Sequence, residues 1–281
     1  MKTQVWISFG VRDRPDAEVD KILKVAEQPH PGHTAFIFDF DSESPRLAEL
    51  RSLLRTYGVE WRERVDYRYS RSELLGAPLI QLSLERGVAG DGVEWGNDYD
   101  LSNACSQCGT GARPVPPFKL KASETPKRGR AFLSVLNEWF VAADVADRLR
   151  TFSDLDLLPT YDHSTGEALP WFELSARHEL PPMDSGTTGL LRQDPCRVCD
   201  KDGYFGTAKE PLMIVYGSDT LHGESVPDAA HTYEHFGQSS LEEPFSMSGF
   251  AQPALLVKPA LLEVLLDAKI GRLWPYPVVI Q

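Results

Sequence analysis

The four cysteines of this chain form two C-x-x-C pairs, and none is left over. The pairs are Cys105-Ser106-Gln107-Cys108 and Cys196-Arg197-Val198-Cys199. Two residues between thiolates allow a tight turn to aim both sulfur atoms at one tetrahedral ion, and two such turns complete a four-thiolate zinc site. We therefore predict one zinc ion bound by Cys105, Cys108, Cys196 and Cys199.

The residues around the pairs indicate a structural rather than a catalytic ion. Gly109 supplies the positive φ that a zinc knuckle commonly needs, whereas Asp200 stands at the same position after the second pair. Four thiolates fill the coordination sphere and leave no place for a catalytic water. Because 87 residues lie between Cys108 and Cys196, unpaired or disulfide-bonded cysteines are the alternative. A redox motif fits less well, since neither pair opens a helix after a strand.

A second candidate for chemistry is the segment His231-Thr232-Tyr233-Glu234-His235, which fits H-x-x-E-H. In the inverted zinc-protease motif of this form, two histidines one helical turn apart hold zinc and the glutamate activates water. That peptidase family takes its third ligand from a downstream glutamate, and Glu263 is the candidate among the 46 residues that follow. Flanking glycine and proline favour a short exposed segment, so we expect the side chains of His231 and His235 to diverge or to be solvated, without a metal. A zinc-dependent hydrolase is the alternative function.

The same region contains no lysine or arginine from position 210 to position 257. Glycine and proline recur through it, so we expect its carboxylates on the surface, where they would steer a basic partner. An ordinary solvated acidic loop is the alternative. The predicted partner-binding carboxylates are Glu210, Asp219, Glu224, Asp228, Glu234, Glu242 and Glu243.

The overall charge favours a protein partner over nucleic acid. The chain has 41 acidic and 29 basic residues and a formal net charge of -12, which repels nucleic acid and suits a basic protein. It contains no apolar run of about 18 residues and no signal-peptide core, so we expect a cytoplasmic protein without a membrane anchor. It also lacks G-x-S-x-G, phosphate-loop and G-x-G-x-x-G motifs, which favours a non-catalytic protein.

The first 90 residues read as an N-terminal α/β unit. Strands are predicted over 4–11, 34–40, 59–69 and 79–84, with helices over 15–27 and from Pro45 to Gly58. Ser44 is placed to cap the second helix and Gly58 to end it. The four glycines between positions 87 and 96 mark the boundary. The predicted domains are therefore residues 1–90 and a zinc-binding α+β region, residues 91–281.

The second region contains a pattern that occurs twice at a shift of 116 residues. Phe140-Val141 aligns with Leu256-Val257, and Leu157-Leu158-Pro159 aligns with Leu273-Trp274-Pro275. Each copy reads as strand, helix and strand, and each lies downstream of a C-x-x-C pair. Two decayed copies of one zinc-knuckle module would bring the knuckles together, although apolar periodicity alone also produces such matches.

The paired knuckles, the acidity and the segment from Pro253 to Val278 resemble a group of bacterial proteins. This group comprises the double-CXXCG-motif proteins and cognate immunity proteins of polymorphic toxin systems. The resemblance covers Cys105 to the C-terminus, and Asp200 departs from the glycine expected after the second pair. It implies a cytoplasmic bacterial protein that binds and blocks a cognate toxin, and it carries over no inhibitory residue. We expect an α+β fold and a zinc-stabilised immunity protein.

Overall fold

The computed structural model confirms a mixed α+β fold. It describes residues 1–10, 16–25, 30–31, 35–84, 95–127, 129–134, 137–207, 210–219, 221, 226–241, 251–271 and 273–281. The chain forms two compact units, one of Met1–Ser70 with Gly206–Leu212 and the other of Arg71–Phe205 with Met213–Gln281. The division after Ser70 precedes the boundary predicted near positions 87–96, and residues 85–94 of that segment lie outside the described residues.

The N-terminal unit is an antiparallel sheet with two helices and an aromatic core. Its sheet has the order β2-β3-β1-β4, and α1 contacts α2. Alternation along β1 buries Val5, Ile7 and Phe9, which pack with residues of β3 and of both helices. Gly58 ends α2 at a φ of 59°, as predicted, but Ser44 makes no side-chain capping bond. The elements are β1 (Lys2–Gly10), α1 (Asp16–Val25), β2 (His30–Pro31), β3 (Ala35–Asp41), α2 (Pro45–Thr56) and β4 (Trp61–Arg68).

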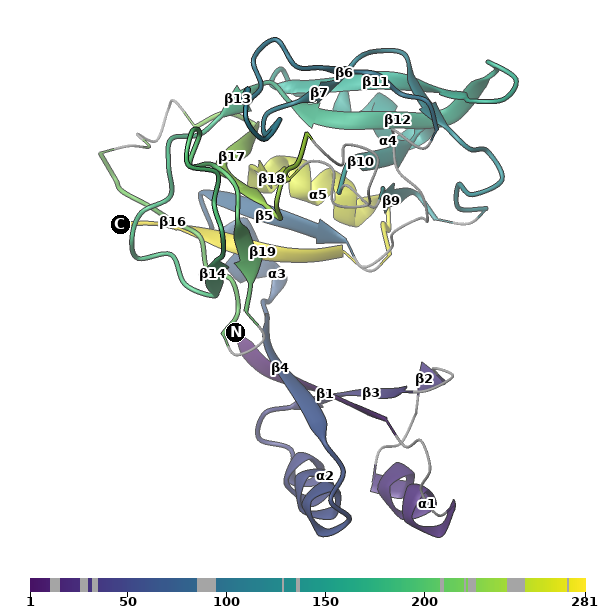
Figure 1. Cartoon of the computed structure of the whole chain (residues 1–281), viewed down its shortest axis with the longest axis vertical. Coiled ribbons are helices and arrows are strands. Elements are labelled where there is room, and N and C mark those ends of the chain that lie inside the picture. Colours follow the sequence, from purple (N-terminus) through teal and green to yellow (C-terminus); the bar gives the residue numbers. More distant parts are fainter. Residues whose placement is uncertain are drawn as a thin grey trace. The chain divides into compact units, whose positions relative to one another are not determined.

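From Arg71 onwards the chain builds two larger sheets and two short hairpins (Figure 1). The sheets have the orders β8-β11-β12-β10-β9 and β13-β17-β18-β5-β19-β16. The elements are α3 (Arg71–Leu75), β5 (Leu79–Leu84), β6 (Tyr99–Asp100), β7 (Arg113–Pro114), β8 (Phe118–Leu120), β9 (Ala131–Leu133), β10 (Trp139–Ala142), α4 (Ala143–Leu149), β11 (Leu155–Asp162), β12 (Ala168–Ala176), β13 (His178–Glu179), β14 (Leu190–Arg192), β15 (Tyr204–Gly206), β16 (Val215–Tyr216), β17 (Ala229–Phe236), β18 (Gln252–Val257), α5 (Pro259–Asp267) and β19 (Leu273–Ile280).

Strand β5 differs from its predicted place. The sequence analysis assigned Leu79–Leu84 to the N-terminal unit, but this strand pairs antiparallel with β18 and β19. Figure 1 shows β5 and β19 side by side although most of the chain separates them. Four of its six residues are buried, so an apolar run that reads as part of the first unit serves as the centre of a later sheet.

The two sheets share one arrangement. In the first, β10 and β11 flank the antiparallel strand β12, α4 connects them, and β8 lies parallel to β11 at the edge. In the second, β18 and β19 flank β5, α5 connects them, and β16 lies parallel to β19. The two helices contact each other. This correspondence is what a duplicated module requires, and common descent of the two halves stays a prediction.

Candidate metal centre

Each cysteine pair lies at the tip of a short two-stranded sheet. The first pair is enclosed by β6 and β7, and the second by β14 and β15. In the first knuckle, the Gly109 N–H donates to the Cys105 carbonyl at 2.8 Å, and the Cys105 N–H donates to the Thr110 carbonyl at 2.9 Å. Gly109 has a φ of 82°, a conformation that glycine adopts without steric cost. The turn therefore has the positive-φ residue that the sequence predicted.

The second knuckle makes the same turn with different side chains. The Asp200 N–H donates to the Cys196 carbonyl at 3.0 Å, and Asp200 has a φ of 57°. Aspartate tolerates this left-handed conformation better than most residues do. The Arg192 guanidinium donates to the Asp200 carbonyl at 2.7 Å and to its carboxylate at 2.5 Å. The missing glycine thus changes the residue at the turn but not its backbone geometry.

The four sulfur atoms lie together at the spacing of a tetrahedron. Cys105 Sγ is 3.8 Å from Cys196 Sγ, Cys108 Sγ is 3.7 Å from Cys199 Sγ, and all four lie within 4.8 Å of one another. With metal–sulfur bonds of about 2.3 Å, a tetrahedral zinc site places its sulfur atoms roughly 3.8 Å apart. A disulfide needs about 2.0 Å, so the cysteines are free thiols. The cluster could hold a metal ion.

The environment of the thiols differs between the ligands. Burial opposes ionisation of Cys105, but hydrogen bonds from the backbone N–H groups of Cys108 and Gln107 and with the Cys108 and Cys196 thiols together lower the pKa of the Cys105 thiol to about 7. Burial raises the pKa of Cys108 and of Cys199. A metal ion must therefore displace protons from these thiols when it binds, so its affinity falls at low pH.

Asp202 and Ser239 connect the two knuckles beneath the sulfur atoms. Asp202 is 2% exposed, and its carboxylate accepts from the Cys196 N–H at 2.7 Å and from the Ser239 N–H at 3.2 Å. The Ser239 hydroxyl oxygen accepts from Thr110 Oγ1 at 2.9 Å, and Thr110 Oγ1 lies 3.1 Å from Cys108 Sγ. The sequence analysis missed these partners, because nothing in their local pattern connects residues 110, 202 and 239.

The H-x-x-E-H segment is a strand, and the predicted exposed loop is wrong. It forms β17, where Ala229, Ala230, Thr232, Glu234 and His235 are buried. The segment is a strand, with an irregularity in its pairing with β18 between His231 and His235, so the histidines lack the one-turn helical spacing of the protease motif. Among the described residues, the side chains that lie close enough together to share a metal ion are those of the four cysteines.

Only part of the predicted acidic surface is confirmed as exposed. Glu210 and Asp219 are exposed, but they belong to different compact units. Asp228 is half-buried and pairs with Lys258 at 3.3 Å. The remaining predicted positions Glu224, Glu242 and Glu243 lie outside the described residues.

Glu234 was predicted on the surface, and the structure buries it. Its carboxylate is 4% exposed and accepts from the Met183 N–H at 2.8 Å. Burial raises the pKa of Glu234. Glycine and proline do recur around this segment, but the alternation within β17 turns Thr232 and Glu234 inward. The predicted surface position of Glu234 is therefore wrong.

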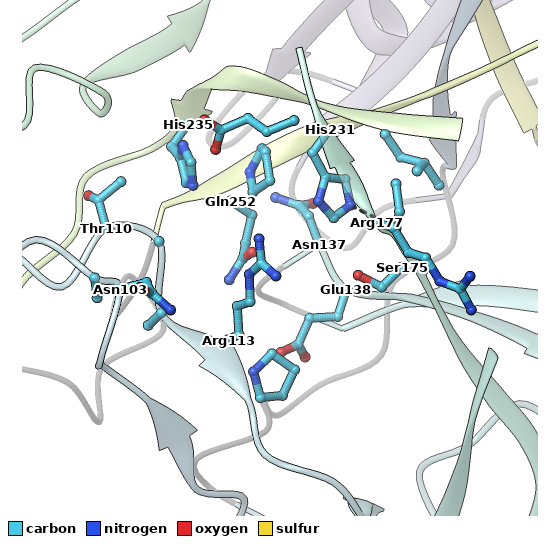
Figure 2. Close-up of a pocket in the computed structure, with 18 of the residues that line it drawn as sticks. Asn103, Thr110, Arg113, Asn137, Glu138, Ser175, Arg177, His231, His235 and Gln252 are labelled. Carbon is cyan, nitrogen blue, oxygen red and sulfur yellow. Dashed lines mark hydrogen bonds between the residues drawn. The ribbon is translucent and has the colours of Figure 1, made fainter. Parts of the chain in front are cut away.

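A polar pocket of about 580 Å³ lies against the metal centre in the C-terminal unit. It is lined by the first knuckle, β11, β12, β17 and β18, and includes Cys105 and Cys199. Figure 2 shows Arg113, His231 and Gln252 pointing toward one another across it. The Ala176 N–H donates to His231 Nε2 at 3.4 Å, and burial lowers the pKa of His231 to about 4. His231 is therefore neutral at physiological pH and carries its proton on Nδ1.

Comparisons with protein families and with curated proteins find no match to this chain. The likeness to the double-CXXCG and toxin-immunity proteins thus rests on the cysteine pairs, the acidity and the closing segment, and it stays a prediction. Among the described residues, none of the helices has the length and apolar character needed to cross a lipid bilayer.

Proposed function

We propose that this protein is a binding protein whose C-terminal unit is held together by one structural zinc ion. The observation that carries the proposal is the meeting of four thiols within 4.8 Å of one another, with sulfur–sulfur distances of 3.7 and 3.8 Å across the two knuckles. Cys105, Cys108, Cys196 and Cys199 would hold the ion, and zinc would supply a rigid tetrahedral link between segments that are far apart in the chain. Four sulfur ligands leave no position for an activated water.

We further propose that the partner is a basic protein, a cognate bacterial toxin that this protein neutralises in the cytoplasm. The formal net charge of -12 supports a basic partner, because complementary charge accelerates association. Among the described residues, the candidates for this contact are the exposed Glu210 and Asp219. The other candidates, Glu224, Glu242 and Glu243, lie outside the described residues. The resemblance to immunity proteins supports the toxin as the kind of partner.

Co-expression tests this proposal. The product of the neighbouring gene, where that gene encodes a secreted toxin, is expressed alone and with this protein. We expect growth arrest alone and rescue by the wild-type chain, with loss of rescue for Cys108→Ser. Charge reversal at Glu224, Glu242 and Glu243 should slow association and weaken its salt dependence while leaving the zinc content unchanged. Absence of rescue, or association rates that ignore both charge reversal and salt, would reject the immunity function.

A further inference from the structure

The pocket beside the metal centre contains a buried carboxyl group that the metal centre does not use. Glu173 lies on β12, the central strand of its sheet, and is 5% exposed. Its strand neighbours in register are Phe140 on β10 and Leu158 on β11, so its surroundings are largely apolar. In the described structure, its Oε2 has no hydrogen-bond partner. Leaving a buried polar atom without a partner destabilises the folded state, and native proteins rarely contain one without a reason.

Most other charges that line the pocket have partners of the opposite sign. Arg177 pairs with Asp156 at 2.8 Å, and Lys201 pairs with Glu179 at 2.7 Å. Each of these two pairs is neutral as a whole. The Glu173 carboxyl therefore receives no compensation from these two cations.

A second buried carboxyl group, that of Glu138, opposes ionisation of Glu173. Glu138 lines the same pocket, is buried, and accepts hydrogen bonds from Tyr99 Oη at 2.7 Å and Ser134 Oγ at 2.9 Å. Burial, followed by repulsion from Glu138 and Asp156, raises the pKa of Glu173 to about 8. Glu173 therefore remains largely protonated at neutral pH while the pocket holds no cation.

We propose that this pocket binds a small ligand through its ammonium or guanidinium group, with Glu173 as the buried counter-ion. A volume of about 580 Å³ falls in the range that accommodates drug-sized ligands. The amides of Asn137 and Gln252 and the Nδ1–H of His231 offer neutral hydrogen-bonding groups for the rest of the ligand. This site goes beyond the proposed zinc and partner binding.

Glu173 is largely protonated in the empty pocket, whereas a bound cation would leave it as a carboxylate. A cation stabilises the carboxylate, so binding should release up to one proton near pH 7. The charged and titratable groups that face the pocket with Glu173 are Glu138, Asp156, Glu179, Arg113, Arg177, Lys201, His178, His231, His235 and the thiols of Cys105 and Cys199. In the zinc-loaded chain these two thiols would be metal ligands, so they would not exchange protons when a cation binds. His231 stays neutral above about pH 5 because its pKa is lowered to about 4. The affinity for a permanent cation should therefore rise up to about tenfold per pH unit from pH 5 to pH 8.

The test compares two probes of the same shape, butylguanidinium and the neutral butylurea, by calorimetric titration of the full zinc-loaded chain. We expect butylguanidinium to bind with a Kd of about 1 mM, a typical value for so small a ligand. Butylurea should bind at least tenfold more weakly. Repeating the titration in buffers of different ionisation enthalpy measures the released proton on the wild-type protein, so this result does not depend on any variant folding.

Matched variants assign the effect to Glu173. Glu173→Gln should lose at least tenfold in affinity for butylguanidinium and release no proton. Glu167→Gln, which removes an exposed carboxylate that does not line the pocket, should bind as the wild type does. Arg113→Gln removes a like charge and should bind the cation at least as tightly.

A second arm distinguishes a free ligand from a side chain of a protein partner. The blocked peptide Gly-Gly-Arg-Gly-Gly and its citrulline analogue are titrated in parallel with the butyl probes. Tighter binding of the arginine peptide than of butylguanidinium assigns the site to a partner's side chain, whereas weaker binding assigns it to a free small cation. Equal affinity for butylguanidinium and butylurea, or unchanged binding by Glu173→Gln, would overturn the cation site. So would the lack of any binding by the zinc-loaded wild type, and that result would leave the zinc proposal standing.

Discussion

The two halves of the C-terminal unit have the same strand arrangement, but their central strands come from different parts of the chain. The first half places β12, the strand that follows β11, between β10 and β11, while the second half uses β5 from far upstream. Their knuckles differ in a similar manner. Gly109 makes the left-handed turn of the first, and Asp200, held by Arg192, makes that of the second. The backbone geometry is thus retained where individual residues are not.

The comparison also explains why the knuckles meet across 87 residues. Each knuckle precedes an edge strand of its own sheet, β8 or β16, and α4 contacts α5 where the two sheets come together. A metal ion held by the four cysteines would link the two halves directly. We therefore expect the strongest effects on stability from changes that remove this shared link, and weaker effects from changes within one knuckle.

The largest effect should follow from Cys108→Ser, which removes one of the shared ligands. Binding of a structural zinc contributes about 10–16 kcal/mol in small zinc domains, so loss of the ion should unfold the C-terminal unit. The control Leu149→Ala truncates a buried side chain of α4 and should cost about 2–5 kcal/mol. Chemical denaturation and zinc content are measured on both variants. Equal destabilisation by the two changes would show that the unit does not depend on the ion.

The second effect concerns Gly203, which follows the second knuckle at a φ of 82°. A Cβ atom there would clash with the Gln193 backbone carbonyl oxygen. Gly203→Ala should therefore lower the free energy of unfolding by about 2–5 kcal/mol through backbone strain and overpacking. Gly271→Ala is the matched control, because an added methyl group there meets nothing within 4 Å. The midpoint of urea unfolding checks both. A Gly203→Ala protein as stable as the control would contradict the geometry of the second knuckle.

The third effect distinguishes the supports of the two knuckles. Asp202→Ala removes the buried acceptor for the Cys196 and Ser239 N–H groups, and we expect a loss of about 3 kcal/mol together with weaker zinc binding. Thr110→Val removes one hydroxyl beside Cys108 in the first knuckle and should cost about 1 kcal/mol. Competition with a zinc chelator ranks the two variants. A larger effect of Thr110→Val would reverse the assignment of the main support.

The smallest effects come from exchanging the turn residues. Gly109→Ala forces a side chain into the left-handed region and should destabilise by about 1–2 kcal/mol. Asp200→Gly relieves the strain of a side chain in the left-handed region but also removes the exposed contact between Asp200 and Arg192. These two effects oppose each other, so the free energy of unfolding should change by no more than about 1 kcal/mol. Thermal unfolding of the zinc-loaded proteins measures this. If Asp200→Gly were the more damaging of the two, the Arg192 contact would be essential to the second knuckle.

The sequence allowed the cysteine site to be predicted because the spacing within a C-x-x-C pair is local. Two residues between ligands fix a turn, and four cysteines without remainder favour one shared ion. The α+β class and the left-handed turn at Gly58 followed from equally local patterns. By contrast, the place of β5 depends on pairing with β18 and β19, which come from the opposite end of the chain, and apolar alternation does not identify the partner of a strand.

The buried positions of Glu234, His235 and Glu173 were not predictable for a related reason. Charged residues flanked by glycine and proline are usually exposed, and whether a strand is covered on both faces depends on the sheet opposite. The pocket beside the knuckles requires β12 and β17 to approach each other, and these strands belong to separate sheets. A sequence pattern shows the alternation of each strand but not which surface it faces.

X-ray absorption spectroscopy at the zinc edge tests the central claim most directly. The measurement uses the full chain purified under reducing conditions, with its metal content determined on the same sample. We expect one zinc ion per chain with four sulfur ligands at about 2.3 Å. A protein without stoichiometric zinc, or a zinc ion with nitrogen ligands at about 2.0–2.1 Å, would contradict a four-thiolate site.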